Sequence, residues 1–154
     1  MQLKMTKEAC HRRLQRAAGR GLKGGMLLLG YCYQEGWSTK QDYQKAAYWY
    51  SKAINKREPI AFLFLGQLYQ DGHGVKKDGQ KAARLFKRAY RLGVVAATIH
   101  LANIYDSGMN NIHPSRKLAI YWYKIAARPD GYGSKLARER LAELMKPTLN
   151  DANG

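Results

Sequence analysis

The chain has 154 residues and a formal net charge of +16, from 27 lysines and arginines against 11 aspartates and glutamates. This length suits one domain with a continuous core, and the lack of any run of 18 apolar residues excludes a transmembrane helix. So large a positive charge attracts acidic partners and speeds their encounter, but it does not indicate a fold.

The first predicted element is a helix over residues 6–20, which we interpret as half of a repeat. Leu14 lies 36 residues before Tyr50, and Ala17 lies 36 residues before Ala53. The segment therefore has the spacing of the second helix of the repeats that follow it.

Three full repeats are predicted next, over residues 25–57, 61–93 and 97–128. A step of 36 residues relates small, aromatic and glycine positions in the three copies: Gly30, Gly66 and Ala102; Tyr33, Tyr69 and Tyr105; Gly36, Gly72 and Gly108. Beyond Gly108 the step grows by one residue, which places an insertion within residues 109–118. A period of this size is typical of a helical solenoid.

Each repeat predicts two helices, A and B. Helix A has small or apolar residues at positions 0, 4, 5 and 8, as in Ala61, Leu65, Gly66 and Tyr69, and these form one stripe on a helix. A glycine turn ends helix A. Three side chains are then expected to accept hydrogen bonds at the start of helix B: Asp42, Asp78 and Ser115.

The last predicted element is a capping helix over residues 134–146. It repeats the spacing of helix A at four positions: Ala137, Leu141, Ala142 and Met145. Residues 147–154 are predicted to form a flexible tail.

The glycine loop of the second repeat has a second interpretation, a phosphate-binding loop. Gly72 and Gly74 are followed by Lys76 and Lys77, but no serine or threonine follows the lysines, and the preceding run 60–69 suits a helix better than a strand. Because a phosphate loop needs both features, the pattern favours a structural turn.

The second copy, "AFLFLGQLYQDGHGVKKDGQKAARLFKRAYRLG", resembles the Sel1-like repeat family, relatives of the tetratricopeptide repeats. It follows the pattern A-x-x-x-L-G-x-x-Y-x-x-G-x-G-V-x-x-D-x-x-K-A. The first copy has Ser38 in place of the second glycine; the third has Ala102 for a glycine, the insertion, and Leu118 for a lysine. The resemblance covers roughly residues 7–146. It implies an all-α, right-handed solenoid of about eight antiparallel helices in a single domain over residues 1–146, with helix A lining the concave side.

Neither an enzyme nor a cofactor or metal site is expected. The four histidines have no ligand spacing with cysteine or acidic residues, and no catalytic triad can be assembled. Cys10 and Cys32 lie on adjacent predicted helices, where a disulfide is geometrically conceivable. The favoured interpretation makes both of them small core residues, because nothing else indicates an oxidising compartment.

The predicted function is a non-enzymatic protein-interaction module, an adaptor, regulator or inhibitor that binds an acidic protein partner. The residues opposite the packing stripe of helix A are predicted to contact the partner or a neighbouring repeat: Leu28, Tyr31, Phe64, Gln67, His100 and Asn103. Two basic residues of the second helix B, Arg84 and Arg88, are predicted to steer association. The alternative is a nucleic-acid-binding protein that uses its basic helices.

The sequence supports only a default expectation for the cellular compartment, and it supports no expectation for the oligomeric state. The start "MQLKMTKEACHRRLQR" has no apolar stretch of the kind that follows the charged end of a signal peptide. The expectation is a cytoplasmic protein; a chain trimmed of its signal peptide would look the same and be periplasmic or secreted.

Overall fold

The computed structural model describes residues 6–109, 111–129 and 135–147. These residues form helices joined by turns, with one isolated pairing of Met109 and Ile112 as the sole β-type contact in the described part. The helices are α1 (Lys7–Gly19), α2 (Lys23–Glu35), α3 (Tyr43–Asn55), α4 (Pro59–Asp71), α5 (Gly79–Arg91), α6 (Ala97–Ser107), α7 (Arg116–Ala126) and α8 (Lys135–Leu144). The predicted all-α helical-repeat fold is confirmed.

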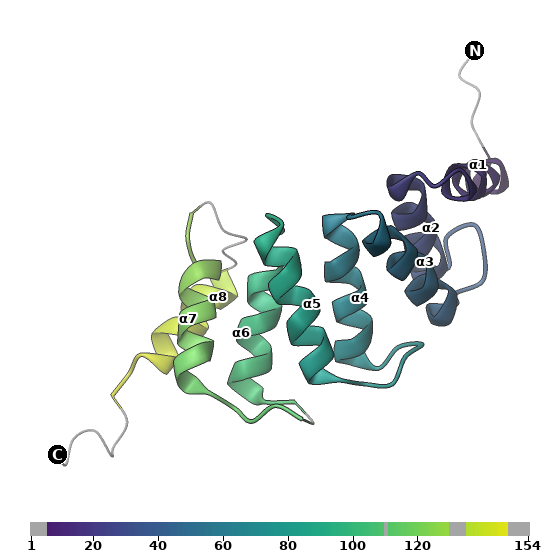
Figure 1. Ribbon diagram of the computed structural model, residues 1–154. Coiled ribbons are helices and arrows are strands. Elements are labelled where there is room, and N and C mark those ends of the chain that lie inside the picture. Colours follow the sequence, from purple (N-terminus) through teal and green to yellow (C-terminus); the bar gives the residue numbers. More distant parts are fainter. Residues whose placement is uncertain (1–5, 110, 130–134, 148–154) are drawn as a thin grey trace.

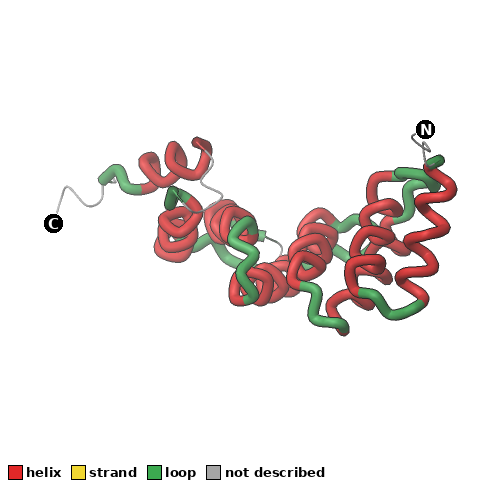
Figure 2. Tube along the Cα trace, turned by 90° about the horizontal axis from the view of Figure 1, so that it is seen from above, coloured by secondary structure: helices red, strands yellow, loops and turns green. Residues whose placement is uncertain are grey.

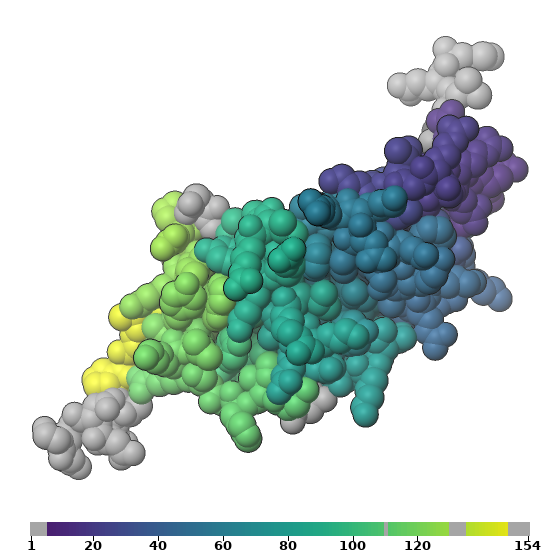
Figure 3. All heavy atoms as spheres, in the orientation of Figure 1, coloured from purple at the N-terminus to yellow at the C-terminus, as the bar shows by residue number. Residues whose placement is uncertain are grey.

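The helices pack in chain order, each against the next, and build an elongated solenoid (Figures 1 and 2). Helices α2, α4, α6 and α8 occupy the A position, and α1, α3, α5 and α7 the B position. In the space-filling view the sequence colours follow one another as bands, with α1 at one end and α8 at the other (Figure 3). Each interior helix therefore has a neighbour on both sides, whereas α1 packs against α2 and α8 packs against α7.

The core of each repeat forms where a large residue of helix B meets a small residue of helix A. A Cβ atom added to Gly30 would lie 2.6 Å from Cε1 of Tyr50, and one added to Gly66 would lie 2.6 Å from Cε1 of Phe86. Tyr50 and Phe86 are both 0% exposed. The glycines thus allow the two helices of a repeat to approach closely, as position 5 of the pattern predicts.

The repeat pattern predicts that the tryptophans at equivalent positions of helix B, Trp49 and Trp122, are both buried between helices, but the two differ in burial. Trp122 is buried in the larger core cluster, as predicted. Trp49 is half-buried at the edge of the N-terminal cluster and touches Tyr48 edge-on, so complete burial was the wrong expectation there.

The turns that end α2 and α4 follow the predicted geometry. Gly36 and Gly72 end α2 and α4 in the left-handed region, with φ of 67° and 78°. The side chains of Asp42, Asp78 and Ser115 each accept a hydrogen bond from the backbone N–H three residues later, at 3.0, 2.9 and 3.4 Å. The structural interpretation of the glycine loop is confirmed.

The two cysteines are free thiols: Cys32 is buried and Cys10 is half-buried. Burial raises the pKa of Cys32, and the nearby Cys10 adds to this effect. Of the predicted end segments, residue 134 and residues 148–154 lie outside the described residues. Across the described ranges, none of the helices combines the length and apolarity needed to cross a membrane.

Candidate functional site

Four of the six predicted A-helix residues lie between neighbouring A helices: Tyr31, Phe64, Gln67 and His100. Leu28, Phe64 and His100 occupy one repeat position, and the last two reach back toward the preceding A helix. The ring of Phe64 on α4 lies 6.0 Å from that of Tyr31 on α2. His100 on α6 lies with Nε2 3.2 Å from Gln67 Nε2 on α4. Side chains at this position therefore link one repeat to the one before it.

Four of the predicted residues are engaged in packing or hydrogen bonds. His100 also stacks on Phe86 at 4.8 Å, and its Nδ1 lies 3.1 Å from Gln70 Oε1. Burial lowers the pKa of His100, and the charge of Asp71 opposes this shift. Phe64 stacks on Tyr50 at 5.3 Å. The structure thus gives Phe64, Gln67 and His100 a structural role at the boundaries between repeats.

Asn103 is held inside the third repeat. Its Oδ1 accepts a hydrogen bond of 2.7 Å from the hydroxyl of Tyr123, which also donates to Asp106 at 3.2 Å. Burial, together with the charge of Asp106, raises the pKa of Tyr123 to about 12, so the phenol remains a hydrogen-bond donor at neutral pH.

Leu28 and Tyr31 differ from the other A-helix residues because they remain exposed, by 51% and 44%. They line an apolar groove of about 470 Å³ with four further residues, and we call it the α1–α2 groove: Cys10, Leu14, Leu28, Tyr31, Cys32 and Trp37. The sequence analysis did not identify Cys10, Leu14 or Trp37 as surface residues of a site. A signal for two of them is the repeat pattern, in which Cys10 and Leu14 hold the positions of the buried residues Ala46 and Tyr50.

A second hollow, of about 320 Å³, lies at the C-terminal ends of α2 and α4 and is polar. Its lining combines glutamines, two histidines and two carboxylates, without a lysine or arginine: Gln34, Glu35, Gln41, Tyr43, Gln67, Leu68, Gln70, Asp71, His73 and His100. Hydrogen bonds inside the lining, such as that between Gln67 and His100 at 3.2 Å, occupy several of these groups. This hollow ties the repeats together with polar contacts.

The basic residues gather on the B helices, and none of them is among the residues that line the groove formed by Leu28 and Tyr31. Helix α5 contains five basic residues and no acidic one, among them the exposed Arg84 and Arg88. Helices α4 and α6 contain no lysine or arginine and one aspartate each. The eight predicted partner-binding residues are therefore not brought together: six lie on A helices and two are exposed on α5.

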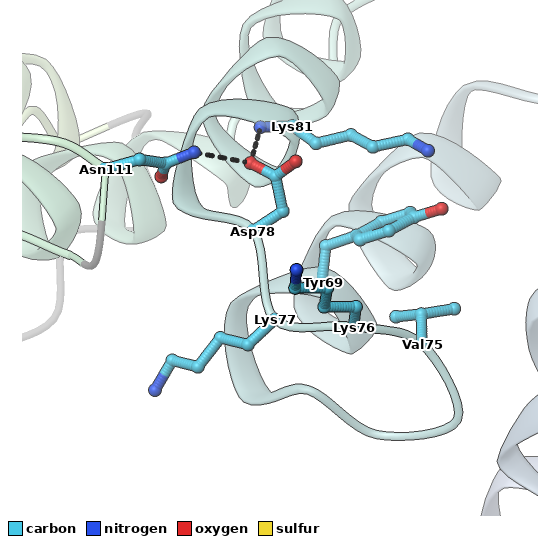
Figure 4. Close-up of a pocket in the computed structure, with 7 residues that line it drawn as sticks. All are labelled: Tyr69, Val75, Lys76, Lys77, Asp78, Lys81 and Asn111. Atoms are coloured by element: carbon cyan, nitrogen blue, oxygen red, sulfur yellow. Dashed lines mark hydrogen bonds between the residues drawn. The ribbon is translucent and has the colours of Figure 1, made fainter.

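The loop of the second repeat borders the hollow drawn in Figure 4, about 600 Å³ in volume. Asp78 Oδ1 accepts hydrogen bonds from the backbone of Lys81 and from Asn111, and Lys81 Nζ lies 4.2 Å from the ring centroid of Tyr69. The side chains of Lys77 and Lys81 extend to opposite sides of the loop (Figure 4). The lysines do not converge on one point, as a phosphate cradle would require.

Within the described residues, no three histidine, cysteine, aspartate or glutamate side chains gather closely enough to hold a metal ion. The titratable groups whose pKa shifts, such as Tyr50 and Asp78, take part in packing or helix capping. In the part of the chain that the structure describes, the arrangement offers surfaces for binding.

Comparison with known proteins gives a consistent result. The family model of the Sel1 repeat matches three consecutive segments, residues 24–57, 61–94 and 95–128. No curated protein matches the chain. Solved structures do, among them a protective antigen of uropathogenic Escherichia coli strains that displays an SLR fold, with 25% identity and a TM-score of 0.82 over 90% of this chain and 29% of that one.

Two further solved structures are similar. A Sel1 repeat protein from Oxalobacter formigenes shares 26% identity at a TM-score of 0.77, covering 88% of this chain and 54% of that one. Cysteine rich protein B of Helicobacter pylori shares 33% identity at a TM-score of 0.58, covering 61% of this chain and 71% of that one. The chain thus spans less than two thirds of the length of the first two proteins.

Proposed function

Because the chain belongs to the Sel1 repeat family, we propose that it is a protein-interaction module that holds an acidic protein partner against its A helices. Sel1 repeats form a protein-interaction fold. The roles that suit this chemistry are those of an adaptor, regulator or inhibitor, which bind a partner without transforming it.

The observation that carries the proposal is the exposure of Leu28 and Tyr31 in an apolar groove. Exposed apolar surface of this kind marks interaction sites, and aromatic residues are frequent anchors in them. Trp37, 40% exposed, adds a second aromatic to the same groove.

The acidity of the partner is inferred from charge. The net charge of +16 is concentrated on B helices such as α5, and its field attracts acidic surfaces over a distance. Arg84 and Arg88 are exposed on a helix that contains no acidic residue, so they suit the steering of a partner rather than its final anchoring.

The test is capture of a partner from an extract of the source organism, followed by titration of the purified partner. Replacing Tyr31 by alanine is expected to weaken binding by about 2 kcal/mol, roughly 30-fold in Kd. Tyr121→Ala is the matched control, because Tyr121 is 54% exposed on α7 and lies outside the groove. Arg84→Ala and Arg88→Ala should slow association and reduce its dependence on salt.

Two results would contradict the proposal. One is a partner that binds the Tyr31→Ala and Tyr121→Ala variants equally well. The other is micromolar or tighter binding of mixed DNA or RNA oligonucleotides at physiological salt, unaffected by Tyr31→Ala, which would favour the nucleic-acid alternative.

A further inference from the structure

The internal repeats show what covers the inner side of a B helix. In α3 and α5 the two residues on this side are Ala46 with Tyr50 and Ala82 with Phe86, and all four are 0% exposed. They are covered by the A helix of their own repeat, through Gly30 and Gly66. The residues of α1 at the same two positions are Cys10 and Leu14, and both line the α1–α2 groove.

The α2 side of the groove supports the same comparison. Phe64 and His100 each contact the preceding A helix, through Tyr31 in one case and through Gln67 and Gln70 in the other. Leu28 occupies the same repeat position, and it is 51% exposed because no A helix precedes α1 among the described residues. The α1–α2 groove therefore has the shape of the site that an A helix fills in each full repeat.

We propose that this groove binds an acidic amphipathic α-helix of the partner protein, which docks in the position and orientation of an A helix. This inference rests on the proposed function and specifies the partner's binding element. The docking helix would present a small residue to Leu14, as Gly30 and Gly66 do to Tyr50 and Phe86. It would contact Leu28 as the ring of Tyr31 contacts that of Phe64.

Charge decides which helix fits best. Helix α1 carries Lys7, Arg12, Arg13 and Arg16 against a single acid, Glu8. Arg13 stands at the repeat position where the other B helices have Trp49, Leu85 and Trp122, so a positive charge borders the groove.

The obvious alternative occupant is α8 of a second copy, because α8 is an A helix with no B helix after it among the described residues. Helix α8 has three basic and two acidic residues, and two chains of net charge +16 repel each other. An acidic helix is attracted to the same surface, and we therefore assign the groove to a partner and not to a second copy.

The experiment uses a synthetic helix of known sequence as its probe. In α4, the residues that pack on the preceding B helix are Ala61, Leu65 and Leu68. Their equivalents in α6 are Ala97, Leu101 and Ile104, which would face solvent in a peptide docked in the α1–α2 groove. The acidic probe is a capped peptide of the Ala97–Ser107 sequence with glutamate at these three positions, and the basic probe has lysine there.

The expected result is saturable binding of the acidic probe, measured by fluorescence anisotropy with the whole chain. The Leu28→Gln variant should weaken this binding about tenfold, as expected when an anchor is lost. The matched control is Leu118→Gln, because Leu118 is 41% exposed on α7 and does not line the groove. A probe with leucine in place of its Ala102 should bind at least about tenfold more weakly, because the added bulk meets Leu14.

The dependence of binding on salt distinguishes an acidic partner helix from α8 of a second copy. Affinity for the acidic probe should fall as sodium chloride rises from about 50 mM to about 300 mM, and the basic probe should bind more weakly at low salt. Equal binding of the two probes, or no effect of Leu28→Gln, would overturn the inference. So would self-association that is detected by sedimentation, strengthens with salt and is lost in Leu28→Gln.

The inference and the proposed function can fail separately. Suppose that a captured partner needs Tyr31 but binds the Cys10→Glu and Leu28→Gln variants normally. This result would support the proposed interaction module and contradict the docking of a helix in the groove. If the acidic probe binds but no partner is captured, the inference that the groove binds a helix is supported and the proposed function fails.

Discussion

The centre of the solenoid and its N-terminal end carry the same repeat pattern in different surroundings. In the α4–α5 pair, Phe86 lies over Gly66 and is completely buried. In α1, Leu14 holds the position of Phe86 two repeats earlier, but it is only half-buried and lines a groove. In a solenoid, the neighbouring repeat sets the burial of a position as much as the residue itself does. Exposure that departs from the repeat pattern therefore points to a binding surface.

The largest contrast is expected between Phe86→Ala and Leu14→Ala. Phe86 is fully enclosed, so its truncation should lower the free energy of unfolding by about 3–5 kcal/mol. Leu14 touches the N-terminal core cluster on one side only, and its truncation should cost about 1 kcal/mol. Urea unfolding followed by far-ultraviolet circular dichroism measures both, and equal losses would mean that α1 is as deeply packed as α5.

A second contrast concerns the small residue of helix A. Gly66→Ala would place Cβ 2.6 Å from the ring of Phe86, so the helices must separate or the ring must move. Overpacking costs about 1–3 kcal/mol, which exceeds the roughly 0.5–1 kcal/mol that alanine gains over glycine in a helix. Combining Gly66→Ala with Phe86→Leu should recover part of the loss. A stabilised Gly66→Ala variant would contradict the close approach of α4 and α5.

A third contrast compares two glycines that differ in backbone conformation. Gly72 has φ of 78°, whereas Gly24 lies in α2 with no atom within 4 Å of an added Cβ. Gly72→Ala should lower the free energy of unfolding by about 1–2 kcal/mol, because L-residues disfavour the left-handed region. Gly24→Ala should leave stability unchanged or raise it slightly. Opposite signs in thermal unfolding would support a structural turn at Gly72; similar values would weaken that interpretation.

The periodicity of the sequence was sufficient to predict the fold because the same packing positions recur in each repeat. The 36-residue step located the small residue of helix A, the glycine turn and the capping side chain, and Asp42, Asp78 and Ser115 all cap as expected. Trp49 shows the limit of this reasoning. It shares a repeat position with the buried Trp122, yet it is half-buried, because the smaller N-terminal cluster covers it less.

The surface was harder to predict from the sequence, because position on a helix does not reveal contacts between repeats. Leu28, Phe64 and His100 are equivalent in the pattern, but only Leu28 remains open. The hydrogen bonds that engage His100 come from Gln67 and Gln70 on another helix. No local pattern records such contacts, nor that Cys10 and Trp37 meet across the α1–α2 groove.

The smallest expected effect is a pH dependence of stability at the position that Leu28 and His100 share. Burial lowers the pKa of His100 below its unfolded value of about 6.5, so the folded chain favours the neutral ring. The resulting contribution to stability is complete above the unfolded pKa. It diminishes as the pH falls below about 6.5 toward the folded pKa, because the unfolded chain then binds more protons. Asp71 faces the ring and reduces the effect. Asp42, Asp78 and Asp106 also have lowered pKa values, but their contributions are lost only in more acidic solution, near and below the carboxyl range.

Urea midpoints of the wild type and of His100→Asn at several pH values between 7.5 and 5 provide the measurement. The wild type should lose more stability across this range than the variant; parallel curves would show that His100 is not held in its neutral form by the fold.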